Sequence, residues 1–460
     1  MRHTRVVLED LFYLSVLSSV FLLTHLGTGS LASWDEAIYS TVAKEIVRSG
    51  HWFRLTLGGD AWVDKPPLVI WAMAFFYKLF GVHEFSARFF SALCGLGTVL
   101  VTYFFGRELL NRWAAWIGAL VLLSSSHFFR FARFGMTDTP LTFFILLSFY
   151  FFWKGRLKNR YLIFSGIALG LAVMTKGLAA FVAFPIIWFF CWFSDELDVL
   201  SRSPYWIGVM IAVAIALPWN IYEMVVNRDA FVSEVLWKHL FLRSFTVLDG
   251  HAGSPYFYIR TRVNKYHPWI LVGIFSGPLF VFKAWRERSP ESILLSVWIF
   301  SVLGIYTLVR TKLAWYILPL YPALSLTVGY VVAKIFPESQ KNFMRLLFVV
   351  VMALHIPYSH IFNQDYSRDL KGIAARVQAF VPSGEKVGLY DYHEIPAATF
   401  YLERQTVYLD NPDVFGEGAK AAHFYCLIHE KDLLGVSGFV AKEGLVVRGE
   451  FEHLKLLCKG

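Results

Sequence analysis

The stretch LFYLSVLSSVFLLTHL, residues 11–26, decides the fold together with two charged segments that follow it, Trp34-Asp35-Glu36 and Val63-Asp64-Lys65-Pro66-Pro67. An apolar run of this length predicts a membrane-spanning helix. No small-residue cleavage site precedes Trp34 and further apolar runs follow, so we expect a retained helix rather than a secretory signal. Charges beside hydrocarbon need a partner or a water-filled cavity, and these segments therefore predict a functional site.

The composition extends this prediction to the whole chain. Of 460 residues, 56% are hydrophobic, 18% aromatic and only 17% charged, which is more apolar surface than a soluble fold can bury. We therefore expect a mostly α-helical, polytopic membrane protein with about eleven spans, in a range of 10 to 13. The expected spans are 9–26, 87–106, 113–131, 139–154, 161–175, 177–193, 204–226, 268–284, 291–309, 313–334 and 344–362.

Basic residues in the short connections predict the orientation. They recur on alternate connections, which the positive-inside rule assigns to the cytoplasm. These residues are Arg2, Arg5, Arg107, Arg112, Lys154, Arg156, Lys158, Arg160, Lys283, Arg286, Arg288, Lys341 and Arg345. The N-terminus is then expected inside, and everything after about residue 363 outside.

The opposite side also carries many cations that topology does not require. A solvated loop explains any one of them, but as a set they indicate an external surface that meets anions, such as the phosphates of lipids or lipid-linked substrates. They are Lys44, Arg48, Arg54, Lys65, Arg88, Arg133, Lys238, Arg243, Arg260, Arg262, Lys265, Arg310 and Lys312.

Two external connections, 27–86 and 227–267, are too long to be simple turns. The first contains an amphipathic pattern from Glu36 to Ser49, and the second contains another from Phe231 to Leu242. Helices of this kind lie along the membrane interface. A further apolar piece, Leu68 to Phe80, is short and follows two prolines, so we expect it to be interfacial or re-entrant.

After about residue 363 the composition becomes that of a small water-soluble domain. The pattern predicts a compact α/β domain over 363–460, separate from a transmembrane domain over 1–362. Its expected helices are 370–380, 395–402 and 431–434, and its expected strands are 386–390, 407–408, 423–428, 445–447 and 454–457.

Two acidic positions stand at the predicted outer face. Asp35 and Glu36 follow the first span, and Asp138 precedes a proline at the start of another span. Helix capping accounts for either position. The alternative is a carboxylate that acts as a general base or a cation ligand.

Cations accompany these acids on the same face. The prolines after Lys65 hold the chain stiffly and would present that ammonium at a fixed position, although a lysine that snorkels to the interface is the simpler reading. Arg310 and Lys312 stand before the aromatic residues of a new span, where interface anchoring is the alternative. Lys176 adds a cation at another external turn.

Other residue types contribute less. His239, His251, His267 and His393 are predicted outside but show no paired ligand spacing. Cys94 and Cys191 lie in apolar spans, whereas Cys426 and Cys458 could form a bridge only outside the reducing cytoplasm. A phosphate-binding glycine loop and a serine elbow are both missing from the sequence, which argues against a nucleotide-driven reaction.

Together the motifs resemble the bacterial polyprenyl-phosphate-sugar glycosyltransferases of the GT-C fold, which include the lipid A aminoarabinose transferase and relatives of the protein O-mannosyltransferases. The similarity covers roughly residues 30–330 in the right order. It rests on the acid pair 35–36 and on the segments 64–68, 85–88, 137–144, 174–177, 217–219, 251–253 and 311–313 with Tyr316 and Pro319.

The resemblance implies an inverting sugar transfer from a polyisoprenyl (undecaprenyl) phosphate on the periplasmic face of the inner membrane. It implies Asp35 and Asp138 as catalytic acids. It also implies Lys65, Lys312 and Arg310 as contacts to the donor phosphate, with substrate contacts from Glu36, Tyr39, Arg88, Arg133, Lys176 and Tyr316. It implies no particular cofactor, and a divalent metal with Asp64 and His393 among its ligands is an option. We expect a monomer that acts on lipid-linked donors and on lipid or polysaccharide acceptors, with no nucleic acid partner.

The chain also departs from the aminoarabinose transferases. An arginine commonly follows the acid pair closely in that group, whereas Ala37 and Ile38 stand here, and the usual glutamate before Lys-Pro-Pro is Asp64. The predicted spans are also fewer and the C-terminal domain smaller. These differences leave the sugar, the acceptor and any metal site open, but they do not affect the reaction class.

Two other functions remain as alternatives. A transporter or flippase of lipid-linked saccharides would be expected to place charges deep within several spans and to show pseudo-symmetric halves, and neither pattern is visible. An envelope sensor with a ligand-binding C-terminal domain would leave the acids at the membrane face unexplained. Among acceptors, a protein Ser or Thr hydroxyl is an alternative to lipid A.

Overall fold

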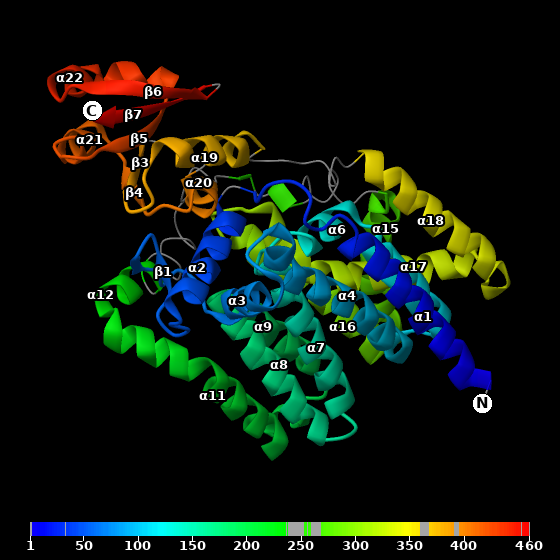
Figure 1. The fold of residues 1–460 in the computed structure, drawn as a ribbon. Coiled ribbons are helices and arrows are strands. Elements are labelled where there is room, and N and C mark those ends of the chain that lie inside the picture. Colours follow the sequence, from blue (N-terminus) through cyan, green and yellow to red (C-terminus); the bar gives the residue numbers. More distant parts are fainter. Residues whose placement is uncertain are drawn as a thin grey trace. The chain divides into compact units, whose positions relative to one another are not determined.

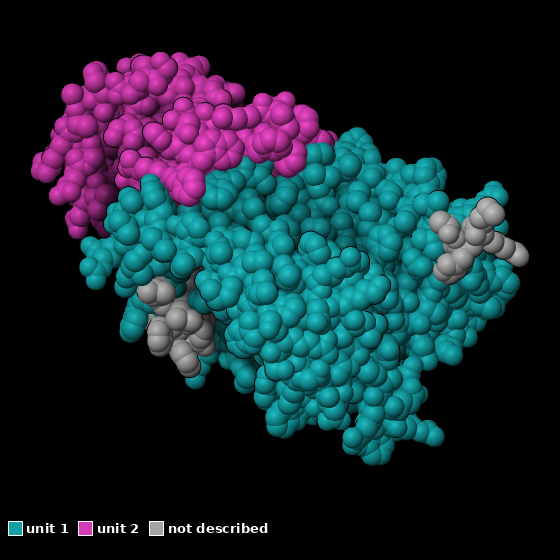
Figure 2. Space-filling model, turned by 90° about the horizontal axis from the view of Figure 1, so that it is seen from below, with its two compact units in different colours: residues 1–26, 63–72, 88–362 teal, residues 27–62, 73–87, 363–460 magenta. Residues whose placement is uncertain are grey.

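The computed structural model describes residues 2–32, 34–235, 237, 253–254, 256–258, 268–358, 368–390, 395–451 and 453–459. The described chain forms two compact units, coloured separately in Figure 2. Unit 1 comprises residues 1–26, 63–72 and 88–362, and unit 2 comprises residues 27–62, 73–87 and 363–460. Unit 2 thus contains most of the predicted first external connection in addition to the C-terminal residues.

Unit 1 is built from helices (Figure 1). They are α1 (Arg2–Leu23), α5 (Arg112–Leu123), α6 (Ser126–Ala132), α7 (Asp138–Gly155), α8 (Arg160–Lys176), α9 (Ala183–Phe193), α10 (Asp198–Ser201), α11 (Ser203–Val226), α12 (Arg228–Phe231), α15 (Ile270–Glu287), α16 (Pro290–Leu308), α17 (Tyr321–Ile335) and α18 (Lys341–Tyr358). Short 3-10 helices are η1 (Gly177–Val182), η3 (Ala314–Leu320) and η4 (Glu338–Gln340), while α3 (Leu68–Phe80) and α4 (Glu84–Leu109) have residues in both units.

These helices confirm a polytopic membrane protein. Among the described residues, six helical runs are long and apolar enough to cross a membrane, or seven if α5 and α6 together form one span. Each of the eleven stretches expected from the sequence falls on a helix or a helical run of the structure. The short apolar piece after the two prolines is a separate helix, α3, with the predicted bounds.

One of these long runs, Arg160–Phe193, contains two antiparallel segments. Lys176, at its middle, contacts Asp138 at the start of α7, whereas Glu196, just after its end, contacts Arg156 just after the end of α7. The chain therefore reverses after Lys176, where Gly177 adopts a φ of +52° that favours glycine. This reversal agrees with the prediction of separate stretches over 161–175 and 177–193.

The expected single span over 113–131 is wrong in one respect. Helices α5 and α6 meet at an angle of 67°. The hydroxyls of Ser124 and Ser125 bond to carbonyls of the preceding helical turn, at Leu120 and Val121. Such bonds let short polar side chains compete with the helical ladder, which the hydropathy of the stretch does not register.

A buried charge network joins four helices at the end of unit 1 that the sequence assigns to the cytoplasm. Asp10 of α1 is fully buried and accepts hydrogen bonds from Tyr103 of α4 at 2.8 Å and Arg112 of α5 at 2.7 Å. Lys341 of α18 lies 2.5 Å from its other oxygen. A carboxylate at this depth needs such partners, and the network therefore ties these four helices together.

Unit 2 combines a five-stranded sheet with helices. The sheet comprises β3 (Val387–Tyr390), β4 (Thr406–Leu409), β5 (Tyr425–His429), β6 (Leu445–Phe451) and β7 (Leu454–Lys459), in the order β4-β3-β5-β7-β6. Parallel pairs join β3 to β4 and β5, and antiparallel pairs join β7 to β5 and β6. The helices are α2 (Asp35–Ser49), α19 (Arg368–Phe380), α20 (Ile395–Leu402), α21 (Pro412–Gly418) and α22 (Ser437–Lys442), with 3-10 helix η5 (Glu430–Val436). This agrees with the α/β expectation.

Three elements of unit 2 differ from the sequence expectation. The helix expected over 431–434 is the 3-10 turn η5, which leads into α22. The prediction missed α21, although Asn411 caps it by accepting from the backbone N–H groups of Asp413 and Val414 and Pro412 opens it. It also missed the hairpin of β1 (Thr56–Leu57) and β2 (Asp60–Ala61), whose turn residues Gly58 and Gly59 have positive φ.

The register of the sheet shows whether Cys426 and Cys458 can form a disulfide. Cys426 of β5 lies opposite Leu457, and Cys458 of β7 lies opposite Tyr425. Directly opposed residues share a face of the sheet and adjacent residues alternate, so the two thiols point to opposite faces. All four cysteines are free, and burial raises the pKa of the Cys426 thiol. A bridge between Cys426 and Cys458 is therefore excluded by geometry.

Some predicted features lie outside the described residues. These are His239, His251, His267 and His393, the cations Lys238, Arg243, Arg260, Arg262 and Lys265, and half of the helix expected over 231–242.

Candidate active site

The residues predicted for the site fall in both units. Asp35, Glu36 and Tyr39 belong to unit 2 and lie on α2. The rest of the described set belongs to unit 1: Asp64, Lys65, Arg88, Arg133, Asp138, Lys176, Arg310, Lys312 and Tyr316. Each group is described within its own unit.

Asp35 is the first residue of α2 and is half-buried. Trp34 precedes it with a φ of +69°, a conformation that a bulky side chain rarely adopts. The capping position of α2 is Trp34, which makes no side-chain cap, so capping does not explain Asp35. Strained backbone of this kind concentrates at functional sites.

Glu36 holds the segment that precedes α2 in place. Its side chain is buried, and one carboxylate oxygen accepts a hydrogen bond from the backbone N–H of Ala32 at 2.7 Å. Tyr39, one turn later, is buried, and its ring centroid lies 5.9 Å from that of Trp62. The two side chains therefore fix the start of α2 and with it the position of Asp35.

A buried ion pair marks the site in unit 1. The Lys176 ammonium, in the last residue of α8, lies 2.6 Å from the Oδ1 atom of Asp138, the first residue of α7. Their side chains are 8% and 3% exposed, so neither charge is balanced mainly by water. Tyr316 of η3 places its ring 5.2 Å from the same ammonium. Three elements that are distant in sequence thus converge on one carboxylate.

Asp138 is also not a helix cap. The capping position of α7 is Thr137, which makes no side-chain cap. The fixed partner of Asp138 is Lys176, a residue the sequence placed on the same face without pairing the two.

Lys65 lies near this ion pair in unit 1. A Cβ built on Gly177, the residue after Lys176, would lie 3.6 Å from the Cγ atom of Pro66. The Lys65 side chain is 9% exposed, and its ammonium lies 2.7 Å from the Asp64 carboxylate. The rigid Pro66-Pro67 segment therefore holds a second cation close to the turn that carries Lys176.

Two buried arginines hold the end of α1. Arg133 donates to the carbonyls of Phe21 and Leu22 at 2.7 and 3.0 Å, and Arg88 donates to the carbonyl of Leu26 at 3.1 Å. Burial, followed by repulsion from Arg88, lowers the pKa of Arg133 to about 10. Cations at a helix C-terminus satisfy its last carbonyls, so both arginines position α1.

Lys312 has a similar structural role. Its ammonium donates to the carbonyls of Thr307 and Val309, each at 2.7 Å, and to that of Tyr306 at 3.3 Å. These carbonyls lie at the C-terminal end of α16, and burial lowers the pKa of Lys312. Arg310, by contrast, is exposed.

The sequence reasoning missed two tyrosines beside this cluster. Tyr306 of α16 has its ring centroid 5.5 Å from that of Tyr316 and 6.4 Å from that of Tyr258. Burial raises the pKa of Tyr258. A tyrosine within the apolar run 291–309 was the available signal for Tyr306, because a buried phenol needs a polar neighbour.

The metal prediction has little support among the described residues. They contain no group of three or more His, Cys, Asp and Glu side chains that could hold a metal ion. Asp64 is paired with Lys65, and His393 lies outside the described residues.

The arrangement in unit 1 suits chemistry on an anionic leaving group. It combines a fixed carboxylate paired with the Lys176 ammonium, tyrosine rings, and a segment carrying Lys65 that approaches the turn after Lys176, in surroundings largely closed to water. Cations held in such surroundings stabilise developing negative charge more strongly than they do in water. A carboxylate beside them can hold a cation or accept a proton.

Comparisons with known proteins extend this description. Residues 64–222 match the family model of dolichyl-phosphate-mannose-protein mannosyltransferases. An uncharacterized protein of Aquifex aeolicus is 30% identical over 68% of this chain and 62% of its own length. An undecaprenyl phosphate-alpha-4-amino-4-deoxy-L-arabinose arabinosyl transferase of Aeromonas hydrophila is 27% identical over 70% of this chain and 60% of its own length. The chain thus spans about three fifths of the length of these two relatives.

Solved structures match over the whole chain. ArnT from Cupriavidus metallidurans bound to undecaprenyl phosphate is 18% identical, with a TM-score of 0.83, over 100% of this chain and 99% of ArnT. The oligosaccharyltransferase of Archaeoglobus fulgidus is 14% identical, with a TM-score of 0.64, over 92% of this chain and 70% of its own. The fold inferred from the motifs is therefore confirmed: the chain has the GT-C fold of these solved structures, and in sequence it is similar to arabinosyl transferases and to the protein mannosyltransferase family model.

Proposed function

We propose that this protein transfers a sugar, with inversion, from a polyisoprenyl phosphate donor such as undecaprenyl phosphate to an acceptor of the cell envelope. The observation that carries the proposal is the buried Asp138–Lys176 ion pair, with Lys65 held beside the same turn. Similarity to undecaprenyl phosphate arabinosyl transferases, and to the structure of ArnT bound to undecaprenyl phosphate, supports the donor class.

The proposed step forms one bond and breaks another at the anomeric carbon. The acceptor oxygen attacks that carbon from the side opposite the phosphate, and the bond between the carbon and the phosphate oxygen breaks. The electron pair leaves with the polyisoprenyl phosphate, which changes from a phosphodiester to a phosphomonoester. A hydroxyl acceptor gives its proton to a carboxylate, whereas an ionised phosphate acceptor needs no base.

The roles of individual residues follow from their chemistry. Asp35 is the proposed catalytic carboxylate, and Asp138 the second acid, held in place by Lys176. Lys65 is the proposed contact to the donor phosphate, and the exposed cation Arg310 is proposed to assist it. Lys312, Arg88 and Arg133 already donate to backbone carbonyls, so we assign them the positioning of helices around the site.

The acceptor and the location form the finer part of the proposal. We propose lipid A as the acceptor, with a protein hydroxyl as the alternative, on the periplasmic face of the inner membrane. The N-terminus would lie in the cytoplasm, with the C-terminal residues in the periplasm. The alternation of basic connections along the sequence supports this orientation.

The test uses the full-length protein in lipid nanodiscs with a labelled undecaprenyl-phosphate sugar, and it measures the release of undecaprenyl phosphate. Asp35→Asn should lower the transfer rate by about 100-fold or more, because an amide cannot accept the proton. Asp60→Asn is the matched control, since Asp60 is an exposed acid of the same unit, and it should leave the rate unchanged.

Asp138→Asn needs a second variant, because removing one partner of a buried ion pair destabilises a fold. Asp138→Asn combined with Lys176→Met removes both charges and should fold while remaining inactive. Undiminished release by Asp35→Asn and by the double variant would overturn the site. Movement of intact donor across the bilayer without release would instead identify a flippase.

A further inference from the structure

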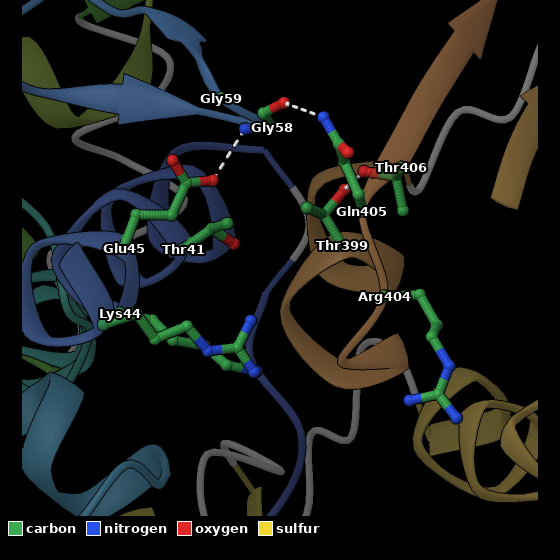
Figure 3. Close-up of a pocket in the computed structure, with 10 residues that line it drawn as sticks. Thr41, Lys44, Glu45, Gly58, Gly59, Thr399, Arg404, Gln405 and Thr406 are labelled. Atoms are coloured by element: carbon green, nitrogen blue, oxygen red, sulfur yellow. Dashed lines mark hydrogen bonds between the residues drawn. The ribbon is translucent and has the colours of Figure 1, made fainter. Parts of the chain in front are cut away.

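A basic cavity lies wholly within unit 2, and none of its lining residues is among those proposed above for sugar transfer. It has a volume of about 230 Å³ and is lined by α2, the β1–β2 turn, α20 and the start of β4. Figure 3 shows Lys44 and Glu45 of α2 on one side and Gln405 and Thr406 on the other, with the Gly58-Gly59 turn between. Segments more than 300 residues apart in sequence therefore build one cavity.

The lining carries more positive than negative charge. Lys44, Arg48 and Arg404 contribute three cations, and Glu45 is the one carboxylate among the lining residues. Both oxygens of Glu45 are engaged, one by the hydroxyl of Thr56 and the other by the backbone N–H of Gly58 at 2.7 Å. The carboxylate thus holds the hairpin turn in place and leaves the cations as the groups that a ligand would meet.

Lys44 is unusual among lysines because its side chain is buried. It is 5% exposed, and its ammonium donates to the carbonyl of Phe400 at 2.6 Å and lies 4.9 Å from that ring's centroid. An ammonium carries three donors, so one bond to a carbonyl leaves donor capacity at the cavity. A buried lysine with this little compensation is costly unless an anion joins it.

The other two cations frame Lys44. Arg48 stands one turn further along α2 and is exposed. Arg404 also lines the cavity, but its guanidinium donates to the carbonyls of Val381 and Gln378 and points away from the other lining residues in Figure 3, so it adds positive charge and not a donor for the ligand. Threonine side chains from α2, α20 and β4 complete the lining: Thr41 donates to the carbonyl of Ala37, and the hydroxyls of Thr399 and Thr406 bond each other at 2.9 Å.

We propose that this cavity is a binding site for a phosphate group, either free or on a lipid headgroup. Planar guanidinium groups, an ammonium and hydroxyls are the donors that phosphate recognition uses. A cavity of about 230 Å³ is smaller than the pockets of ~300–1,000 Å³ that hold drug-sized ligands, which restricts the ligand to a small anion or the tip of a larger one. The inference does not depend on the proposed sugar transfer.

The first experiment titrates inorganic phosphate into the full-length protein by calorimetry, in detergent at constant ionic strength. Arg48→Gln should weaken phosphate binding by about tenfold, the usual effect of losing one charge-assisted hydrogen bond. Arg48 is exposed, so the variant is expected to fold. Arg448→Gln removes an exposed arginine elsewhere in unit 2 and should bind phosphate like the wild type.

A lipid arm separates the two sources of phosphate. Thermal unfolding is measured in phosphatidylcholine nanodiscs with and without phosphatidic acid, whose headgroup is a phosphomonoester. A rise in Tm with phosphatidic acid that Arg48→Gln abolishes supports a headgroup ligand, and calorimetric binding of free phosphate supports a soluble one. If neither ligand distinguishes Arg48→Gln from Arg448→Gln, the proposal is wrong. Binding lost in Lys65→Gln instead of Arg48→Gln would assign the phosphate to the other site and also overturn it.

The pH dependence gives a further readout. Burial, and then repulsion from Arg48, lowers the pKa of Lys44 to about 8, while Glu403 opposes this shift. The charged side chains around Lys44 are Arg48, Arg404 and Glu45 in the cavity lining, with Glu403 beside them. Phosphate affinity should therefore fall about tenfold between pH 7 and 9, as Lys44 loses its proton. Unchanged affinity from pH 7 to 9 would exclude Lys44 as a ligand.

Discussion

At the scale of one residue, Lys312 could serve either of two roles: contact to the donor phosphate or capping of the carbonyls at the end of α16. Its position beside Arg310 predicted a contact to phosphate, yet its ammonium donates to three carbonyls at the end of α16. Such bonds satisfy carbonyls that a helix leaves without partners, and the positive charge suits the negative end of the helix dipole. The residue type alone determines the charge of this side chain, whereas its partners depend on how the chain packs.

Lys312→Met should therefore lower the free energy of unfolding by about 1–3 kcal/mol, the usual cost of leaving buried polar groups without partners. Arg310→Gln, two residues away and exposed, should leave it within about 0.5 kcal/mol. Chemical denaturation in detergent measures both. An unchanged unfolding midpoint for Lys312→Met, together with a raised KM for the donor, would show that phosphate contact is the main role.

The packing of α8 on α11 is decided by small residues at the scale of the element. A Cβ built on Gly166 would lie 2.1 Å from the carbonyl oxygen of Gly208, and one built on Gly208 would lie 2.5 Å from that of Leu162. Gly170, four residues after Gly166, is similarly close to Ala212. Backbones that approach this closely gain van der Waals contact that lipid cannot supply in the same geometry.

Gly166→Ala should consequently separate the two helices and destabilise the protein by about 1–3 kcal/mol, because overpacking outweighs the better helix propensity of alanine. Gly304→Ala on α16 is the matched control, since a Cβ there meets nothing within 4 Å. It should leave the stability equal or slightly higher. Equal unfolding midpoints for both variants in nanodiscs would contradict the close approach.

Unit 2 shows at the scale of the whole molecule that one compact body can come from three stretches of chain. Residues 27–62 contact the C-terminal residues through Lys44, which bonds the Phe400 carbonyl, and through the backbone N–H of Leu31, which donates to the hydroxyl of Tyr401 at 2.7 Å. Residues 73–87 join through Glu84, which lies 2.6 Å from the ammonium of Lys371. The C-terminal residues therefore also support the helix that begins with Asp35.

Deletion of residues 363–460 should make the segment 27–62 sensitive to trypsin, because Lys44 would lose the contacts that bury it. The control carries a protease site inserted at residue 363 and is cut there without removing the C-terminal part. That protein should keep the segment protected if the contacts of unit 2 hold without the covalent link. Equal protection of the deleted and the intact chain, followed by mass spectrometry, would show that 27–62 folds independently.

The sequence by itself determined most of the helices, the membrane class and the family resemblance, although it missed α21 and the bend between α5 and α6. Apolar runs of sufficient length have few alternatives in a bilayer, and the bounds of α3 and α20 were predicted to the residue. It also placed Asp138 and Lys176 on one face, because both stand at the ends of such runs. Apolar runs and the charges at their ends depend only on residues that are adjacent in the sequence, so they can be recognised without the tertiary structure.

Only the tertiary structure decided which charges meet. It paired Asp138 with Lys176, assigned Lys312 to the end of α16, and assembled the basic cavity of unit 2 from segments more than 300 residues apart. The sequence alone does not show which of many oppositely charged or polar residues a charged side chain at the membrane face contacts. Its actual partner depends on distances of a few ångströms that helix packing fixes, because electrostatic interactions between buried groups fall with distance and depend on the local exclusion of water.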